Sequence, residues 1–167
     1  MHKSNHLQYG LVISAIIILL SVLFYVLNLS TASWVKWVST AVIFVGVIFT
    51  CTQFSKLNNG NVTFGNVFAN GFKTTSLIAL VTVLFSVVFI LIFPDIKEKA
   101  LEEARRQMES QGQSDEIIEK AIAMTSKMFM VFVLAGGIFG TLFFGAIASL
   151  IGAAVAKKNP NVQQPQL

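Results

Sequence analysis

The side chains that could carry acid–base or metal chemistry gather in one stretch of this chain. All eight acidic residues lie between Asp95 and Glu119, and six of the twelve basic residues lie among or just after them. Opposite charges recur there four residues apart, the spacing at which helical side chains form ion pairs on a solvated face. The predicted pairs are Lys99 with Glu103, Glu102 with Arg106, and Glu116 with Lys120. We therefore predict a charged, solvated surface and no metal site.

The remaining polar residues form no catalytic or cofactor-binding pattern. His2 and His6 lie in the amino-terminal tail, away from every acidic residue. The sequence Gly71-Phe72-Lys73-Thr74 resembles the end of a phosphate-binding loop, but Phe72 separates the glycine from the lysine and no predicted strand precedes it. We predict no catalytic residue, no cofactor and no metal ligand, and therefore a non-enzymatic protein.

Four long apolar runs must position these polar segments. Of the 167 residues, 54% are hydrophobic and 12% are charged, whereas about a quarter of the residues of a soluble domain are charged. About 20 apolar residues cross the hydrocarbon core of a bilayer, so residues 9–29, 34–54, 72–93 and 128–156 are predicted transmembrane spans. The runs are continuous rather than alternating, which indicates helices. We predict an all-α, polytopic membrane protein, with residues 1–167 as a single integral membrane domain.

The polar segment between the third and fourth spans, residues 94–127, has the pattern of two helices. Pro94 suits the first position of a helix, and apolar residues then recur every four positions up to a turn near Gly112. Ser114 is a good N-cap for the second helix. The apolar positions are Ile96, Ala100, Ala104 and Met108, followed by Ile117, Ile118, Ala121, Ile122 and Met124. We predict an antiparallel, extramembrane helical hairpin with its tip at residues 111–113.

Aromatic residues precede the third span at helical spacing. Phe64, Phe68 and Phe72 recur every four residues after Thr63, which is a good N-cap. This pattern predicts a short helix at the membrane interface that runs into the third span. A binding site for an aromatic ligand is the alternative.

Small residues recur every four positions in the last apolar run. They are Gly137, Thr141, Gly145, Ser149 and Ala153, with Gly136 and Gly140 beside them. Small side chains on one face let a neighbouring helix approach closely, which is a main source of helix attraction in lipid. We predict a helix-packing seam. The pattern leaves open whether the partner helix belongs to the same chain or to a second copy.

The basic residues bear on orientation and on partners. Four spans place both termini on one side with residues 55–71, and that side carries Lys3, Lys56, Lys73, Lys157 and Lys158. The other side carries Lys36 and six basic residues, so the count of Lys and Arg alone slightly favours the reverse orientation. The eight acids make residues 94–127 net anionic, and we predict both termini in the cytoplasm. The basic residues do not cluster with aromatics on one face, which excludes nucleic acid as a partner.

The order of short motifs is similar to that of a known family. The motifs are Tyr9-Gly10-Leu11 after a short basic start, Val62-Thr63-Phe64-Gly65 with Phe68 and Gly71-Phe72, Glu102-Glu103 through Met108-Glu109 to Gln113-Ser114, and Lys157-Lys158-Asn159-Pro160 after a glycine-rich span. This order resembles uncharacterised bacterial membrane proteins grouped as domain of unknown function 4199. The resemblance implies four helices in a bacterial inner (cytoplasmic) membrane, and it supplies no activity.

Two classes of function remain open from the sequence. The first is a structural or partner-binding membrane component, in contact with membrane lipid, whose residues 94–127 bind a protein partner or a second copy. The alternative is a small transporter or a passive channel subunit. A proton-coupled transporter needs an ionisable group inside the bilayer, and no Asp, Glu, His or Arg lies within the four runs. A passive pore formed by an oligomer stays open.

Overall fold

The computed structural model of this protein describes residues 2–30, 32 and 34–159. Within those ranges the chain forms six helices and no strand. They are α1 (His6–Val26), α2 (Val35–Leu57), α3 (Phe64–Ile92), α4 (Asp95–Ser110), α5 (Asp115–Lys127) and α6 (Phe129–Val155). Four of them, α1, α2, α3 and α6, are long and apolar enough to cross a membrane. The fold is therefore all-helical with four candidate membrane spans, as predicted.

The bounds of all four long helices differ from the predicted runs, and two of the differences have a local cause. α1 ends at Val26 rather than at residue 29, because Asn28 has a φ of 54°, in the left-handed region that a continuing helix does not use. α3 begins at Phe64, so the predicted short helix and the third span form one continuous helix. The prediction of Thr63 as its N-cap is confirmed. The Asn66 N–H donates to Thr63 Oγ1 (3.2 Å), and the Thr63 N–H donates to Asn66 Oδ1 (3.1 Å), which makes a capping box.

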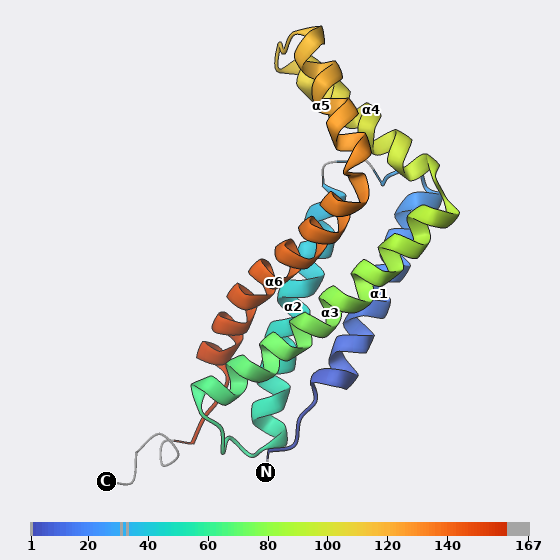
Figure 1. The fold of residues 1–167 in the computed structure, drawn as a ribbon. Coiled ribbons are helices and arrows are strands. Elements are labelled where there is room, and N and C mark those ends of the chain that lie inside the picture. The colour runs from blue at the N-terminus through green and yellow to red at the C-terminus, as the bar shows by residue number, and fades with distance from the viewer. Residues whose placement is uncertain (1, 31, 33, 160–167) are drawn as a thin grey trace.

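α3 is the central helix of the bundle. It contacts α1, α2 and α6 and meets the start of α4 (Figure 1). α6 packs on α3 and α2. Fully buried side chains at these contacts include Val47 and Cys51 of α2, Ile78 of α3 and Ala148 of α6. These four small or medium-sized side chains fill the space between the three helices, so the interior there is closed.

Burial is concentrated at one end of the bundle. The buried residues of α6 lie between Gly145 and Ala153, and those of α3 lie between Val67 and Val83. No residue of α6 from 129 to 144 is buried, and α6 and α3 diverge toward α4 and α5 (Figure 1). We call the end that holds the α2–α3 loop, residues 58–63, the packed end. The opposite end, next to α4 and α5, is the splayed end.

α4 and α5 contact each other beyond the splayed end (Figure 1). Gly112, with a φ of 73°, makes the turn after α4, and the Gln113 N–H donates to the Met108 carbonyl (3.2 Å). Such a glycine in the left-handed conformation is a common helix end. Ser114 occupies the predicted N-cap position with extended backbone angles, but its side chain makes no capping hydrogen bond.

The predicted apolar face of α5 is wrong in part. Ile118 is buried at 1% exposure, and Ala121 and Ile122 are half-buried beside it. Ile117 and Met124 are instead 51% and 60% exposed. The reason is geometric, because residues 118, 121 and 122 share one helical face, whereas residues 117 and 124 lie on the adjoining face. α4 has no buried residue, and its four predicted apolar positions are half-buried.

Candidate functional site

The predicted small-residue seam of α6 lies against α3 of the same chain. A Cβ built on Gly145 would overlap the Thr75 side chain, and one on Gly137 would lie 2.7 Å from Val83 Cγ2. Ser149 and Ala153 are fully buried, whereas Gly137 and Thr141 are half-buried. The five seam residues therefore share one side of the helix but are buried to different depths, in line with the divergence of α6 from α3.

Two glycines outside the predicted seam also allow a close approach between helices. A Cβ on Gly71 of α3 would lie 2.6 Å from Cys51 Sγ and 2.8 Å from Ser149 Oγ. A Cβ on Gly152 of α6 would lie 2.8 Å from Cys51 Cβ. Cys51 of α2 therefore sits between glycines of α3 and α6, which explains why this small apolar side chain is buried. The spacing of small residues within one helix could not reveal this three-helix contact.

A buried pair of amides joins three helices at the packed end. Asn70 Nδ2 of α3 donates to Asn5 Oδ1 (2.7 Å), and Asn5 Nδ2 donates to the Thr50 carbonyl of α2 (3.2 Å). Asn5, the N-cap of α1, is 7% exposed, and Asn70 is 5% exposed. The Ser4 hydroxyl also donates to Asn70 Oδ1 (3.1 Å). Buried amides are stable only when hydrogen-bonded, so this set fixes the start of α1 against α2 and α3.

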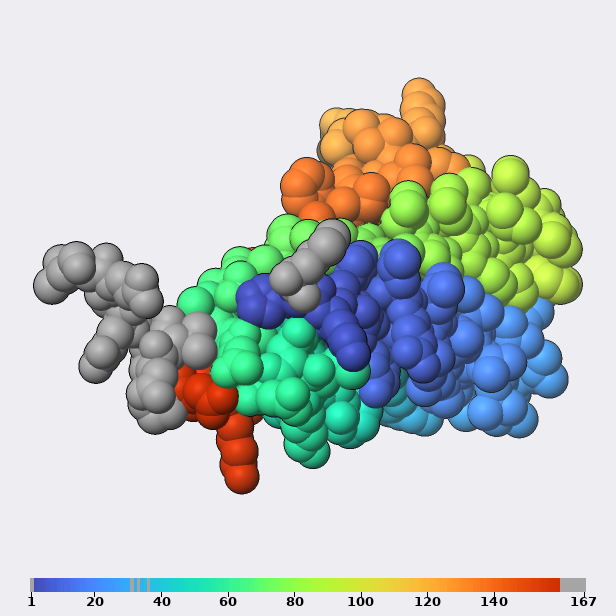
Figure 2. Space-filling view, turned by 90° about the horizontal axis from the view of Figure 1, so that it is seen from below, coloured from blue at the N-terminus to red at the C-terminus, as the bar shows by residue number. Residues whose placement is uncertain are grey.

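The α2–α3 loop holds the chain segments that flank α1 and α6. The Lys3 N–H donates to Asn58 Oδ1 (2.9 Å), and Asn58 Nδ2 donates to the Lys3 carbonyl (3.0 Å). On the other side, the Asn159 N–H donates to the Gly60 carbonyl (2.9 Å). Figure 2 shows this end, with α2, α3 and their loop (turquoise and green) between the amino-terminal residues (dark blue) and the end of α6 (red). Residues 2–5 and 156–159 therefore lie at the same end of the bundle.

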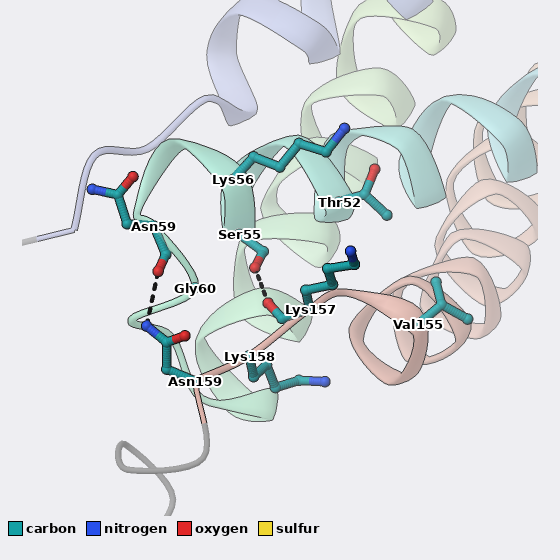
Figure 3. Close-up of a pocket in the computed structure, with 9 residues that line it drawn as sticks. All are labelled: Thr52, Ser55, Lys56, Asn59, Gly60, Val155, Lys157, Lys158 and Asn159. Carbon is teal, nitrogen blue, oxygen red and sulfur yellow. Dashed lines mark hydrogen bonds between the residues drawn. The ribbon is translucent and has the colours of Figure 1, made fainter.

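A cavity of about 710 Å³ lies beside this loop (Figure 3). It is formed by the last turns of α2, by the loop and by the segment after α6. The Ser55 hydroxyl of α2 donates to the Lys157 carbonyl and so ties two of these walls together. The lining residues are Thr52, Ser55, Lys56, Asn59, Gly60, Val155, Lys157, Lys158 and Asn159.

Three lysines give this cavity its charge. Lys158 Nζ donates to the Ala156 carbonyl (3.0 Å) and lies 5.9 Å from the centre of the Phe64 ring. Lys56 and Lys157 are exposed and form no ion pair within the described part of the chain. All eight acidic residues lie in α4 and α5, beyond the opposite end of the bundle. Among the described residues, no acidic side chain lies near these lysines, and the cavity lining is positively charged.

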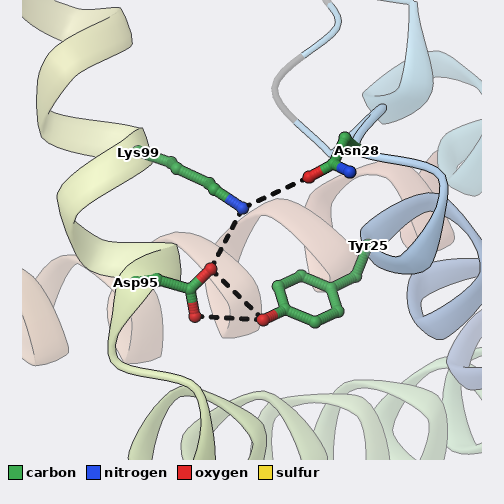
Figure 4. A network of polar contacts seen from close by, with 4 residues as sticks. All are labelled: Tyr25, Asn28, Asp95 and Lys99. Carbon is green, nitrogen blue, oxygen red and sulfur yellow. Dashed lines mark hydrogen bonds and ion pairs between the residues drawn. The ribbon is translucent and has the colours of Figure 1, made fainter.

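A second polar set ties α1 to α4 at the splayed end (Figure 4). The Tyr25 hydroxyl donates to Asp95 Oδ1 (3.0 Å), Lys99 Nζ pairs with Asp95 Oδ2 (3.0 Å), and Lys99 also donates to Asn28 Oδ1 (3.4 Å). The pKa of Asp95 is lowered, mainly by its hydrogen bond with Lys99. Partial burial raises the pKa of this carboxyl, and the hydrogen bond from Tyr25 lowers it further. Asp95 is therefore held as a carboxylate that orients the first turn of α4.

One predicted ion pair is wrong and two are confirmed. Lys99 pairs with Asp95, not with Glu103, because Tyr25 of α1 and Asn28, just after α1, provide further polar contacts on the Asp95 side. Glu103 instead accepts from Gln107 Nε2 (3.3 Å). The pairs Glu102 with Arg106 and Glu116 with Lys120 are present. Within the described residues, no three His, Cys, Asp or Glu side chains are grouped so that they could hold a metal ion.

The helices and the cavity define the class of this protein. It is an all-helical chain with four candidate membrane spans and a lysine-lined cavity at the packed end. The model of one family, described as "Protein of unknown function (DUF4199)", matches residues 8–158, so the chain belongs to that family. The family predicted from the motifs is thereby confirmed. The last of those motifs ends at Pro160, which lies outside the described residues. No curated protein and no solved structure matches the chain.

Proposed function

We propose that this protein is a non-enzymatic structural component of a membrane that acts by binding a second copy of itself. In this proposal α1, α2, α3 and α6 span the bilayer, and α4 and α5 form an extramembrane hairpin. The observation that supports it is a pair of glycines on α6 that no other helix covers. A Cβ built at Gly136 or at Gly140 would meet no neighbouring atom within 4 Å, unlike one at Gly145.

Gly136 and Gly140 have the spacing of a helix-pairing motif. Two glycines four residues apart let a second helix approach closely enough for extensive dispersion contacts in lipid. The side chains around them on the same face are exposed aromatics: Phe132, Phe139 and Phe143. A face with small residues at its centre and aromatic residues around them can be self-complementary, as a symmetric dimer requires. The seam that begins at Gly137 lies on the other side, against α3.

The hairpin extends the same surface beyond the lipid. α4 and α5 carry all eight acids and six bases, and charges of this density are excluded from hydrocarbon. α5 leads into α6 through a single residue, Met128. A second copy that binds along α6 would therefore also bring the two α5 helices together. It would cover Ile117 and Met124, two apolar side chains of α5 that are exposed in the single chain.

Cysteine crosslinking in native membranes tests this assembly. We expect Phe139→Cys, in a background with Cys51→Ala, to form a disulfide-linked dimer, because Phe139 is 72% exposed on the proposed face. Adding Gly140→Leu should abolish the product. Val45→Cys on α2, which is 70% exposed, is the matched control and should give no dimer. If Phe139→Cys gives no dimer, or if Val45→Cys crosslinks equally well, the proposal is wrong.

We also propose that the packed end faces the cytoplasm, in a bacterial inner membrane. The support is the charge balance: Lys3, Lys56, Lys73, Lys157 and Lys158 lie at this end without an acidic residue, whereas the six bases of residues 94–127 lie among eight acids. The count of Lys and Arg alone slightly favours the reverse orientation, and the bacterial assignment rests on the resemblance. Reporter fusions after Lys56 should report the cytoplasm, and fusions after Gly112 should report the other side. The reverse pattern would contradict the orientation. The carboxyl terminus itself lies outside the described residues.

The transporter or channel alternative has less support. The hydroxyls of Ser14, Thr50, Thr74, Thr75 and Ser149 are buried, and each donates to a carbonyl of its own helix. All five residues are also fully buried, so none of them lines a water-filled path within one copy of the chain. The core between α2, α3 and α6 is filled by apolar side chains. A passive pore would therefore have to form between copies, and the crosslinking experiment would detect such an assembly.

A further inference from the structure

We propose that the lysine-lined cavity at the packed end binds the phosphate of an anionic phospholipid headgroup. Its two free ammonium groups belong to different segments, Lys56 to the end of α2 and Lys157 to the segment after α6. Figure 3 shows both side chains extending to the same side of the cavity, with Thr52 between them. A phosphate oxygen accepts hydrogen bonds from ammonium groups, so the two lysines suit a phosphodiester. The Thr52 hydroxyl already donates to the Phe49 carbonyl (2.8 Å) and is not counted as a donor.

The lysines have a reason to bind an external anion. Like charges in neighbouring positions repel each other unless a counter-ion is present, and no carboxylate among the described residues lies at this end of the bundle. Lys158 is held by backbone carbonyls at the end of α6, so it adds charge to the wall but has fewer free donors. Lys56 and Lys157 remain as the ligands. Basic pockets between transmembrane helices are a known form of anionic headgroup site.

The place of the cavity favours a lipid over free phosphate. Two of its walls are the last turns of α2 and α6, which are candidate membrane spans. Val155, which lines the cavity, is 59% exposed and therefore offers an apolar surface for the first carbons of an acyl chain. If the two helices span the bilayer, as proposed above, the cavity lies at the depth of the headgroups. The inference needs this membrane placement but does not need a second copy of the chain.

The experiment compares lipid binding by the full chain in detergent. Native mass spectrometry would measure retention of phosphatidylglycerol, which is anionic, and of phosphatidylcholine, which is zwitterionic. The test variant is Lys56→Gln with Lys157→Gln. The control is Lys3→Gln with Lys73→Gln, which removes the same charge at the same end from two exposed residues that do not line the cavity. Circular dichroism would verify that both variants are folded.

We expect the wild-type chain to retain phosphatidylglycerol over phosphatidylcholine. Each lysine near an anionic headgroup contributes about a fivefold change in affinity, so the test variant should lose at least about tenfold and the control less than about twofold. Equal losses in the two variants would overturn the cavity as the site. Displacement of the lipid by millimolar inorganic phosphate would overturn the lipid assignment in favour of a free anion. Crosslinking through Phe139→Cys should be unchanged in the test variant, which separates this inference from the assembly proposal.

Discussion

The small residues of α6 are used differently at the two ends of the bundle. Those at the packed end pack against α3, whereas two glycines at the splayed end are covered by no other helix. Gly145, Ser149 and Gly152 are buried against α2 and α3. A Cβ built on Gly136 or Gly140 would instead have no neighbouring atom within 4 Å. The two sets have similar spacing and differ only in the side of the helix that they occupy and in their distance from the packed end. A glycine repeat in a membrane helix therefore identifies a close-approach surface, while burial decides whether that surface is already used.

The same two ends also differ in how polar groups are used. At the packed end, buried amides join α1, α2 and α3, and exposed lysines surround the cavity. At the splayed end, the polar contacts of Tyr25, Asp95 and Lys99 are half-exposed and join only α1 to α4. We infer that the stability of the monomer resides mainly at the packed end and that the splayed end is free to bind partners. Four variants test this division.

The largest effect is expected for Gly145→Leu. The side chain would overlap Thr75 in the closed part of the seam, and overpacking of this kind costs about 1–3 kcal/mol or more. Thermal unfolding in detergent should show a large loss of stability. Gly140→Leu, which meets open space, should leave monomer stability unchanged and should affect only the crosslinked dimer. If Gly145→Leu and Gly140→Leu had the same effect on stability, the α6 surface would be no more closely packed at one end than at the other.

A smaller but clear loss is expected for Asn70→Ala. The change leaves Asn5 Oδ1 without its donor and removes the acceptor of Ser4, and a buried polar group without a partner costs about 1–3 kcal/mol. The control is Ser76→Ala on the same helix, because Ser76 is exposed and bonds only to its own helix. In chemical or thermal unfolding, Asn70→Ala should be clearly less stable than wild type. Ser76→Ala should be as stable as wild type. A neutral Asn70→Ala would show that the buried amides do not hold the packed end together.

Much of this fold could be predicted from local patterns. Continuous apolar runs predicted the four long helices, Thr63 predicted the start of α3, and Gly112 predicted the turn after α4. Each of these features depends on a few neighbouring residues, through helix capping, backbone conformation or hydropathy. The relation between sequence and structure is direct in such cases, because the physical cause lies within one or two turns of helix.

The features that could not be predicted depend on which helices are neighbours. Cys51 lies between Gly71 and Gly152, which are separated widely along the chain. The lysine-lined cavity likewise joins Lys56 to Lys157 across the bundle. Lys99 had acidic residues four positions away in both directions, and contacts with α1 determined its partner. A single sequence carries no signal for such contacts, since they follow from the arrangement of the spans.

A weaker effect is expected for Asp95→Asn, and it should depend on pH. The pKa of Asp95 is lowered in the folded protein, mainly by Lys99. A carboxyl with a lowered pKa stabilises the fold above its unfolded pKa, about 3.9, and this contribution disappears as the pH falls through the folded pKa. The difference in thermal stability between wild type and Asp95→Asn should therefore be constant near neutral pH and should shrink below about pH 4. A difference that persists unchanged in acid would exclude the ionised carboxylate as its source.

The smallest effect is expected for the ion pair of α5. Glu116 and Lys120 pair at an Nζ to Oε1 distance of 2.6 Å, but their side chains are 79% and 76% exposed. Exposed pairs of this spacing contribute about 0.2–0.5 kcal/mol to a helix, and salt reduces this further. Glu116→Gln with Lys120→Gln preserves net charge and should leave the thermal unfolding of the bundle unchanged at 0.15 M salt. Because the pair lies far from the packed end, a large loss of stability in this variant would mean that α4 and α5 help to hold the bundle together. The two ends would then form one cooperative unit, and the assignment of stability to the packed end alone would fail.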